Sequence, residues 1–311
     1  MRVLIFGGAG FIGSHLTRTL LDAGHDVTVA DNLKTAHSLD LLGGRAGARF
    51  VHLDIRCPED FEALDAGPFD RVYHLAASYA NALSVENPKL DERTNVQGTL
   101  QVLDYCRRVR TGLLIYTGSS SSYGDAPLPF DEEGPMQPQT PYALHKHVAE
   151  WHVRSSGLPW AIFRLFNAYG PGDPPGAYRN VIPNMLVAAA LPEGRVRVTG
   201  EAATRDFNYI DDVVGVLADP ERAEGRTLNI GSGDETRVVD LARRILMLFD
   251  LPEDRMVVEP PRSWDGVMRR CADVRRLKEL YGEVAPTSLE AGLRTTATWL
   301  FEHGFSPRGP T

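Results

Sequence analysis

A tyrosine and a lysine lie four residues apart in the segment 141–146. On a helix that begins near Pro141, residues with this spacing share one face, so the ammonium of Lys146 lies near the phenol of Tyr142. A free tyrosine has a pKa of about 10, and a neighbouring positive charge favours its phenolate. The pair therefore has the composition of a general base that removes a proton from a hydroxyl group.

A run of hydroxyl side chains, Ser119 to Ser122, follows the segment 113–117, whose composition predicts a strand. In open α/β sheets the carboxyl ends of the strands face the crevice in which ligands bind. The spacing of Tyr142 and Lys146 alone is also typical of exposed helical pairs. Together, the tyrosine–lysine pair and the serine run predict a site that acts on an alcohol.

A glycine motif, Gly7-x-x-Gly10-x-x-Gly13, stands directly after the apolar segment 3–6 and opens a helical pattern over 12–23. In this context, backbone amides and a helix N-terminus hold a pyrophosphate, and the missing side chains let the phosphates approach. The motif predicts a dinucleotide site.

Asp31 directly follows the apolar run 27–30, at the end of the next predicted strand. Its carboxylate is suited to a ribose 2′-hydroxyl and would repel a 2′-phosphate, and the nearest cation in the sequence is Lys34. Asp54, at the end of the third predicted strand, lies where the adenine edge would be, although an acid in that place is often a helix cap. These residues favour NAD over NADP.

The elements that must position these residues alternate between strand and helix. This order predicts an α/β fold with a Rossmann-type doubly wound parallel sheet and a smaller C-terminal substrate-binding lobe. Pro, Gly and Arg become frequent in 170–204 and 252–273, which indicates the second lobe. The expected division is 1–166 for the NAD-binding domain, joined by about 207–231, and 167–311 mainly for the lobe. The predicted strands are 3–6, 27–30, 50–53, 72–75, 113–117, 161–166 and 227–230.

Composition disfavours several partners. The chain has 311 residues and a formal net charge of −8, which disfavours a general attraction to nucleic acid or to an anionic membrane. Its three cysteines, Cys57, Cys106 and Cys271, are odd in number, far apart and without CxxC spacing, which disfavours both a zinc site and a disulfide framework. The apolar run at the N-terminus is short for a membrane span and leads into the glycine motif. We expect a cytoplasmic protein with no nucleic-acid partner and no membrane partner.

Three histidines, His145, His147 and His152, follow Tyr142 on one predicted helix. His145 and His147 point to different faces, and no acid-rich ligand set accompanies them. We expect solvated or interface roles for these histidines, and no bound metal.

The motifs occur together in an order that resembles a known family. Over nearly its whole length the chain resembles an extended short-chain dehydrogenase/reductase of the NAD-dependent epimerase/dehydratase family, and it is similar to the UDP-glucose 4-epimerase-like nucleotide-sugar epimerases. The segments that carry the resemblance are GGAGFIG at 7–13, VADN at 29–32, HLAA at 74–77, TNVQGT at 94–99, TGSSSSYG at 117–124, PYALHK at 141–146, RLFNAYGP at 164–171, TRDFNYIDD at 204–212 and NIGSG at 229–233.

The resemblance implies a role for individual residues. Ser119 would be the catalytic hydroxyl, Tyr142 the base and Lys146 its partner. The residues implied in NAD binding are Gly7, Gly10, Phe11, Ile12, Gly13, Asp31, Asn32, Asp54, Ile55, Leu75, Ala76, Ala77, Asn95, Tyr142 and Lys146. Those implied in binding a nucleotide sugar are Ser119, Ser120, Tyr142, Asn167, Asn180, Val181, Arg205 and Arg262, the two arginines at the diphosphate. The resemblance further implies a homodimer in which the helix around 98–108 and the helix after Tyr142 pair with their symmetry mates.

The family shares a first step, in which tyrosinate takes a hydroxyl proton and hydride passes from the same carbon to NAD. A 4,6-dehydratase would place an Asp-Glu pair after the active-site hydroxyl residue, and decarboxylases carry a glutamate in that segment. This chain has Ser120 and Ser121 there. The resemblance therefore favours C4 epimerisation of a UDP-sugar through a transient 4-keto intermediate.

Departures from the family pattern leave other reactions open. The usual RPGD-like segment is RSWD at 262–265, and His145 replaces a small residue. Tyr79 and Asn81 differ from what a galactose epimerase would carry. A dehydratase, a decarboxylase or an oxidoreductase acting on nucleotide sugars is the alternative within the family. An idle NAD-binding regulator is the alternative of another class, and the retention of all three predicted catalytic residues argues against it.

Overall fold

The computed structural model describes residues 1–35, 48–178, 180–262, 266–282 and 286–310. Within them, a seven-stranded parallel sheet has the spatial order β11-β6-β5-β4-β1-β2-β3. Its strands are β1 Arg2–Phe6, β2 Asp26–Asp31, β3 Ala48–His52, β4 Arg71–His74, β5 Leu113–Ser119, β6 Trp160–Leu165 and β11 Thr227–Ile230. The chain runs outward from β1 to β3 and then from β4 towards the other edge, so the predicted doubly wound Rossmann-type sheet is confirmed.

Helices cover both faces of the sheet, and alternation within the strands supplies a core to each. In β1, Val3 and Ile5 join the core that includes residues of α1, whereas Leu4 and Phe6 join the core that includes residues of α4 and α5. A sheet covered on both faces has strands that are apolar on both sides, as β1 is after its first residue. The helices of this part are α1 Phe11–Asp22, α2 Asn81–Glu86, α3 Pro88–Glu92, α4 Gly98–Val109, α5 Pro141–Arg154, α7 Ile210–Leu217 and α9 Arg275–Tyr281.

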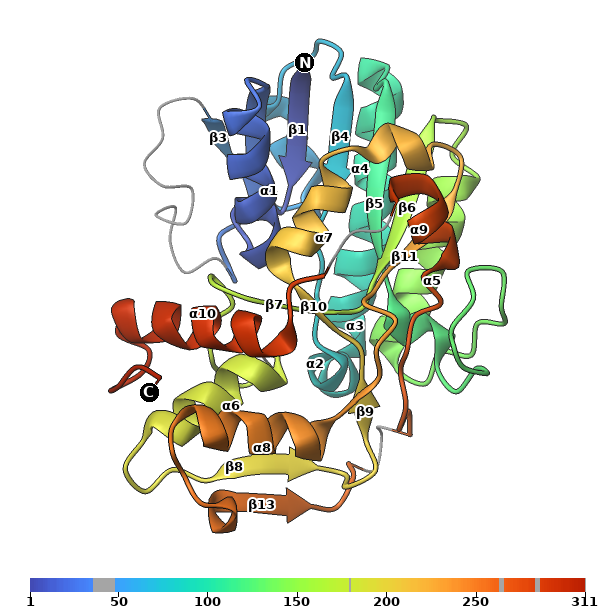
Figure 1. The fold of residues 1–311 in the computed structure, drawn as a ribbon. Helices are drawn as coiled ribbons and strands as arrows, with labels where there is room; N and C mark the ends of the chain where they lie inside the picture. The colour runs from blue at the N-terminus through green and yellow to red at the C-terminus, as the bar shows by residue number, and fades with distance from the viewer. Residues whose placement is uncertain (36–47, 179, 263–265, 283–285, 311) are drawn as a thin grey trace.

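A second lobe lies beyond the carboxyl ends of the strands, which point towards it in Figure 1. Short strand pairs, β7 with β10, β9 with β12 and β8 with β13, connect it and support it. Its elements are α6 Val181–Ala190, β8 Val196–Thr199, β9 Thr204–Arg205, β12 Thr236–Arg237, α8 Val238–Leu248, β13 Met256–Glu259 and α10 Leu289–Glu302, with β7 Asn167–Tyr169 and β10 Phe207–Tyr209 at the junction.

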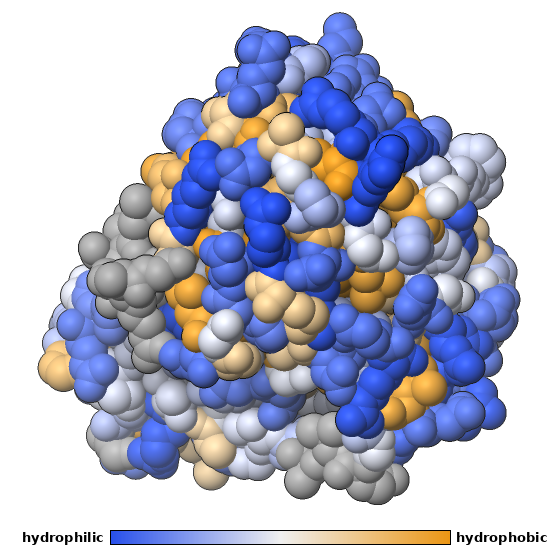
Figure 2. Space-filling model, turned by 90° about the horizontal axis from the view of Figure 1, so that it is seen from above, coloured by the Kyte–Doolittle hydropathy of each residue, from blue (hydrophilic) through white to orange (hydrophobic). Residues whose placement is uncertain are grey.

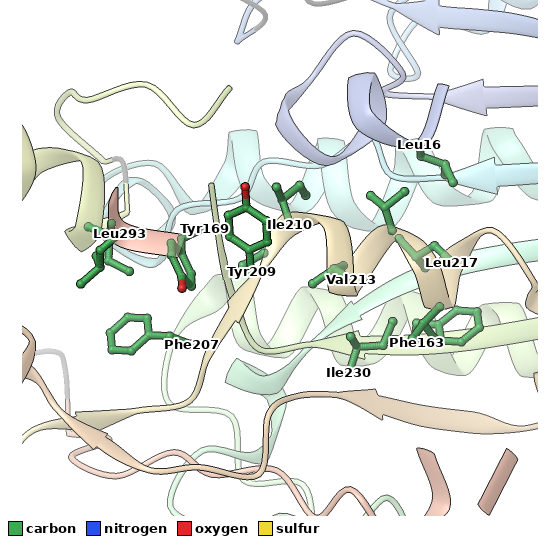
Figure 3. Close-up of a cluster of buried hydrophobic side chains, with 14 of the residues drawn as sticks. Leu16, Phe163, Tyr169, Phe207, Tyr209, Ile210, Val213, Leu217, Ile230 and Leu293 are labelled. Atoms are coloured by element: carbon green, nitrogen blue, oxygen red, sulfur yellow. The ribbon is translucent and has the colours of Figure 1, made fainter. Parts of the chain in front are cut away.

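Helix α7 and the strand before it join the two parts through one apolar cluster. Figure 3 shows Val213 and Leu217 of α7 in the same cluster as Leu16 of α1 and Phe163 of β6, while Tyr209 extends the cluster towards α10. Close packing of this kind leaves little freedom for one part to move against the other. The cleft at the carboxyl ends of the strands therefore lies between two parts that share one apolar core.

The opposite face, at the amino ends of the strands, is mostly hydrophilic, with apolar atoms in small separate patches (Figure 2). Among the described helices, none is both long enough and apolar enough to cross a bilayer. Along the described chain, no three His, Cys, Asp or Glu side chains gather as a set of metal ligands.

Candidate active site

One cavity of ≈ 310 Å³ lies at the carboxyl ends of the strands, a volume within the range of small-molecule sites. It brings together most of the residues that the sequence singled out. Those in its lining are Gly7, Gly10, Phe11, Ile12, Gly13, Asp31, Asn32, Asp54, Ile55, Leu75, Ala76, Ala77, Ser119, Ser120, Tyr142, Lys146, Asn167 and Asn180. Asn95, Val181, Arg205 and Arg262 are not part of this lining.

The glycine motif forms the tight turn between β1 and α1. Gly7 has a φ of +82°, which favours glycine, and a Cβ at Gly13 would lie 2.1 Å from the carbonyl oxygen of Gly7. Gly10 precedes α1 and offers no side-chain cap to its first amides. These amides therefore face the cavity with room for a pyrophosphate, which is the fit that NAD requires at this point.

Asp31 is buried at the end of β2, where both carboxylate oxygens accept backbone hydrogen bonds. Oδ2 accepts from the amide of Ala9 at 3.0 Å and Oδ1 from the amide of Leu33 at 2.8 Å. Burial raises the pKa of this carboxyl, and the amide hydrogen bonds oppose that rise. Each oxygen has a second lone pair, so the carboxylate retains capacity for a ribose hydroxyl.

Asp54 already has partners within the protein. The guanidinium of Arg56 binds its carboxylate at 2.8 and 2.5 Å, and the side-chain amide of Asn32 donates to it at 3.0 Å. The hydrogen bonds from Arg56 hold the pKa of Asp54 well below its usual range. This end of the cavity is thus held in shape by contacts of its own.

Asn95 contacts the site through a neighbouring loop. Its side chain accepts from the amide of Ser78 at 3.0 Å and donates to the carbonyl of Ser78 at 2.9 Å. Ser78 directly follows the lining residues Leu75, Ala76 and Ala77, so Asn95 braces that wall.

Tyr142 stands in the first turn of α5. Thr140 caps this helix, because its hydroxyl accepts from the amide of Ala143, and Pro141 takes the first helical position. Burial raises the pKa of Tyr142 to about 12, a hydrogen bond with Ser119 lowers it, the charge of Asp91 raises it and that of Arg270 lowers it. In the protein alone this phenol is protonated at neutral pH, so a working base needs added positive charge in the complex.

Lys146 lies one turn further along α5 and is also buried. Its Nζ lies 4.3 Å from the ring centroid of Tyr116 on β5, a cation–π contact. Burial lowers the pKa of Lys146 to about 7, while the charges of Asp91 and Glu150 raise it. Its ammonium therefore loses a proton more easily than that of an exposed lysine.

The residues expected at the nucleotide sugar are only partly together. Asn167 donates to the carbonyl of Asp206 at 3.1 Å, and Asn180 donates to Asp173 at 2.8 Å. Val181 begins α6 next to Asn180. Arg205 donates to the carbonyls of Thr204 and Met268 at 2.7 and 3.1 Å.

Arg262 is exposed outside the lining, and the rest of the RSWD segment, 263–265, lies outside the described residues. His145 differs from the expected solvated role, since its Nδ1 lies 2.7 Å from the buried Asp91.

Arg270 is not among the residues that the sequence motifs single out, yet it is only 8% exposed and lines the cavity. Its Nη1 donates to the hydroxyl of Ser121 at 2.9 Å, and Asn81 also donates to that hydroxyl, at 3.4 Å. A signal was present: Arg270 stands two residues before the buried Ala272, so in an extended segment the two share a face, whereas the exposed Arg269 turns outward to Glu235.

Comparison with known proteins agrees with this geometry. A family model described as the NAD dependent epimerase/dehydratase family matches residues 3–231. A putative UDP-glucose 4-epimerase of Methanocaldococcus jannaschii is 30% identical, over 96% of this chain and 98% of that one. A UDP-N-acetyl-alpha-D-glucosaminuronate decarboxylase of Bacillus cytotoxicus is 32% identical, over 97% of this chain and 98% of that one.

A solved structure of UDP-glucose 4-epimerase with UDP-glucose, from Thermotoga maritima, superposes with a TM-score of 0.87 at 29% identity, covering 97% of this chain and 99% of that one. The family match spans the glycine turn, the serine cluster and the Tyr142–Lys146 helix, the same segments that line the cavity. This chain therefore belongs to the NAD-dependent epimerase/dehydratase family, and its cofactor is NAD.

Proposed function

We propose that this chain is a UDP-sugar 4-epimerase that acts through a transient 4-keto sugar. The observation that carries the proposal is that Ser119, Tyr142 and Lys146 share one cavity with the glycine turn, while Ser120 and Ser121 follow Ser119 in the lining. The first set supports oxidation of an alcohol by bound NAD. The serines, in place of carboxylates, support a reaction that needs no further acid or base.

Each side chain has a task that its position supports. Ser119 hydrogen-bonds to the phenol of Tyr142 and would orient both the phenol and the substrate hydroxyl. Tyr142 would take the hydroxyl proton and later return it, and Lys146 would supply positive charge to the phenolate. When bound, NAD accepts hydride from the sugar carbon and returns it.

Elimination of water has less support from the lining. Among its described residues the carboxylates are Asp31, Asp54 and Asp173. Asp31 and Asp54 are at the ends of β2 and β3, by the glycine turn, and Asp173 accepts from Asn180. None of the three stands directly after Ser119, where a dehydratase would need its acid and base.

A labelled substrate tests the proposal. The purified protein would be incubated with UDP-, dTDP-, GDP- and CDP-hexoses deuterated at C4, and the products read by NMR. We expect a UDP-hexose to give its C4 epimer with deuterium still at C4. Deuterium at C6 would mean dehydration. Recovery of all the sugars unchanged would favour the idle regulator.

A second candidate function follows from Arg270. A guanidinium is a planar fork of donors suited to a carboxylate, and this one lies beside Ser121 in the same cavity. The relative from Bacillus cytotoxicus is by name a decarboxylase of a UDP-uronic acid. We therefore also propose a UDP-sugar with a carboxylate at C5, which after oxidation at C4 is a β-keto acid that can lose carbon dioxide.

UDP-glucuronate separates the two candidates when compared with UDP-glucose under the same conditions. Carbon dioxide release with formation of a UDP-pentose would establish the decarboxylase. A C4-epimerised uronate would keep the epimerase reaction and change its substrate, and turnover of UDP-glucose alone would remove the second candidate.

We further propose a cytoplasmic homodimer in which α4 and α5 pair with their symmetry mates. Leu144 and Trp151 of α5 are 47% and 59% exposed, apolar area that such a pairing would cover. Cys57, Cys106 and Cys271 are free thiols, which suits a reducing compartment. Analytical ultracentrifugation at micromolar concentration tests the dimer, and sedimentation as a monomer would contradict it.

A further inference from the structure

Asp91 of α3 is a fully buried carboxylate. Its Oδ1 lies 2.7 Å from Nδ1 of His145 on α5, and an ionised carboxylate only accepts, so this nitrogen carries the proton. Its Oδ2 is buried without a hydrogen-bond partner. Burying a polar group with unmet hydrogen bonds costs free energy. We therefore expect a buried acid with an unpaired oxygen to have a functional role.

The position of the pair relates it to the candidate catalytic residues. His145 directly precedes Lys146, and Tyr142 stands on the same helix one turn earlier. Among neighbouring charges, Asp91 does most to raise the pKa of Lys146, against the burial that lowers it to about 7. The same charge raises the pKa of Tyr142.

His145 stands between Asp91 and the surface. It lines a shallow surface pocket together with Lys89, Glu92, Thr140 and Leu144, and its side chain is 15% exposed. The buried carboxylate thus has the imidazole on its solvent side and α5 on its other side. The ionisable groups near the pair include Lys89 and Glu92 of α3, Tyr142, Lys146 and Glu150 of α5, Tyr116 of β5, and Arg270.

We propose that Asp91 and His145 are positioning residues for the Tyr142–Lys146 pair. Asp91 supplies the negative charge that keeps the buried ammonium of Lys146 charged and in place. His145 holds the Asp91 side chain in place through the Nδ1 hydrogen bond. The inference rests on the proposed catalytic roles of Tyr142 and Lys146.

The test begins with Asp91→Asn in the NAD-loaded protein. Without the negative charge, the phenolate of Tyr142 forms at lower pH and the ammonium of Lys146 is lost at lower pH. We expect both limbs of the activity–pH profile to move down by about one unit, a tenfold loss at a fixed pH on the alkaline limb. Asp104→Asn, which removes an exposed acid from α4, is the matched control and should leave the profile in place.

A spectroscopic readout makes the test independent of turnover. The ultraviolet titration of the phenolate, taken as a difference from Tyr142→Phe, should show the same downward shift in Asp91→Asn. If no nucleotide sugar is turned over and the titration still moves, the proposed function fails and the positioning role stands. If the enzyme turns over and neither readout moves, the positioning role is overturned.

His145 provides a second pair of variants, which decide the matter if Asp91→Asn does not fold. His145→Asn keeps an N–H donor near the place of Nδ1, and we expect it to retain the wild-type profile. His145→Leu removes the hydrogen bond that positions Asp91, so the carboxyl no longer keeps its place beside α5 and we expect the profile to move as in Asp91→Asn. A wild-type profile in His145→Leu would contradict the proposal.

Discussion

The two ends of the cavity are built in different ways. At the end proposed for the cofactor, the lining comes from short segments that follow β1, β2, β3 and β4, and each segment is recognisable within a few residues of sequence. At the end proposed for the sugar, the lining includes Ser121, Asn167, Asn180 and Arg270, which come from distant parts of the chain and come together only through tertiary packing. A local motif can reveal the first kind of site, whereas the second depends on tertiary structure.

Tyr142 lies where the two ends meet, and its removal should have the largest effect. Tyr142→Phe keeps the ring but removes the proton acceptor, so we expect a loss of about a hundred- to ten-thousand-fold in kcat. NAD affinity should stay close to wild type, because the glycine turn and Asp31 are untouched. Steady-state kinetics and NAD titration by fluorescence measure the two effects separately.

Full activity in Tyr142→Phe would remove the proposed mechanism. A parallel loss of NAD affinity would break the comparison, because it would show that the cofactor end depends on the sugar end.

The same contrast explains what the sequence could predict. The strands, the glycine turn and the tyrosine–lysine helix follow from hydrophobic alternation, glycine spacing and a four-residue interval, all of which are local. The inward side of Arg270 and the burial of Asp91 depend on which segments pack together. The pKa of Tyr142 is another case: the sequence indicates a nearby lysine that favours the phenolate, whereas burial raises this pKa to about 12 in the protein alone.

Gly13→Ala tests the cofactor end by itself. The new Cβ would lie 2.1 Å from the carbonyl oxygen of Gly7, so the turn that holds the pyrophosphate must shift. Loss of charge-assisted hydrogen bonds from the shifted amides predicts NAD binding weaker by about ten- to a hundredfold. Isothermal titration with NAD measures it.

Gly215→Ala is the matched control, since a Cβ there meets nothing within 4 Å. Its NAD affinity should equal that of wild type. Unchanged affinity in Gly13→Ala would mean that the turn does not hold the cofactor in the way its shape indicates.

Arg270→Met tests the sugar end. The variant keeps an unbranched apolar chain but loses the guanidinium beside Ser121. If the substrate carries a carboxylate, kcat/KM for that sugar should fall about ten- to a hundredfold, because a hydrogen bond to a charged group contributes about 1.5–3 kcal/mol, while NAD affinity stays unchanged. Equal losses for charged and neutral sugars would contradict carboxylate recognition.

Arg205→Met and Arg262→Met complete the comparison of arginines. If these residues bind the diphosphate, as the family resemblance implies, each variant should raise KM for every nucleotide sugar about equally. An unchanged KM would mean that neither arginine binds the diphosphate. Arg205 would then serve through its hydrogen bonds to two backbone carbonyls, and Arg262 would be an exposed surface charge.

The smallest effect is expected from the Asp54–Arg56 pair, which holds the cofactor end in shape. The pKa of Asp54 is lowered in the folded protein by the hydrogen bonds from Arg56. A lowered folded-state pKa contributes stability that is present above the unfolded pKa of about 4 and is lost as the pH falls through the folded value. Because the pair is partly exposed to solvent, we expect only about 1 kcal/mol from it at neutral pH.

Arg56→Met should therefore unfold at lower urea concentration than wild type at pH 7, and the difference should shrink as the medium is acidified below about pH 4. Asp54→Asn in both backgrounds isolates the pair in a double-mutant cycle and removes the contribution of other acids. A coupling that stays constant with pH would mean that Arg56 stabilises the loop by packing alone. The sheet and the glycine turn would then determine the shape of the cofactor end. The carboxylate of Asp54 would be available to contact the ligand.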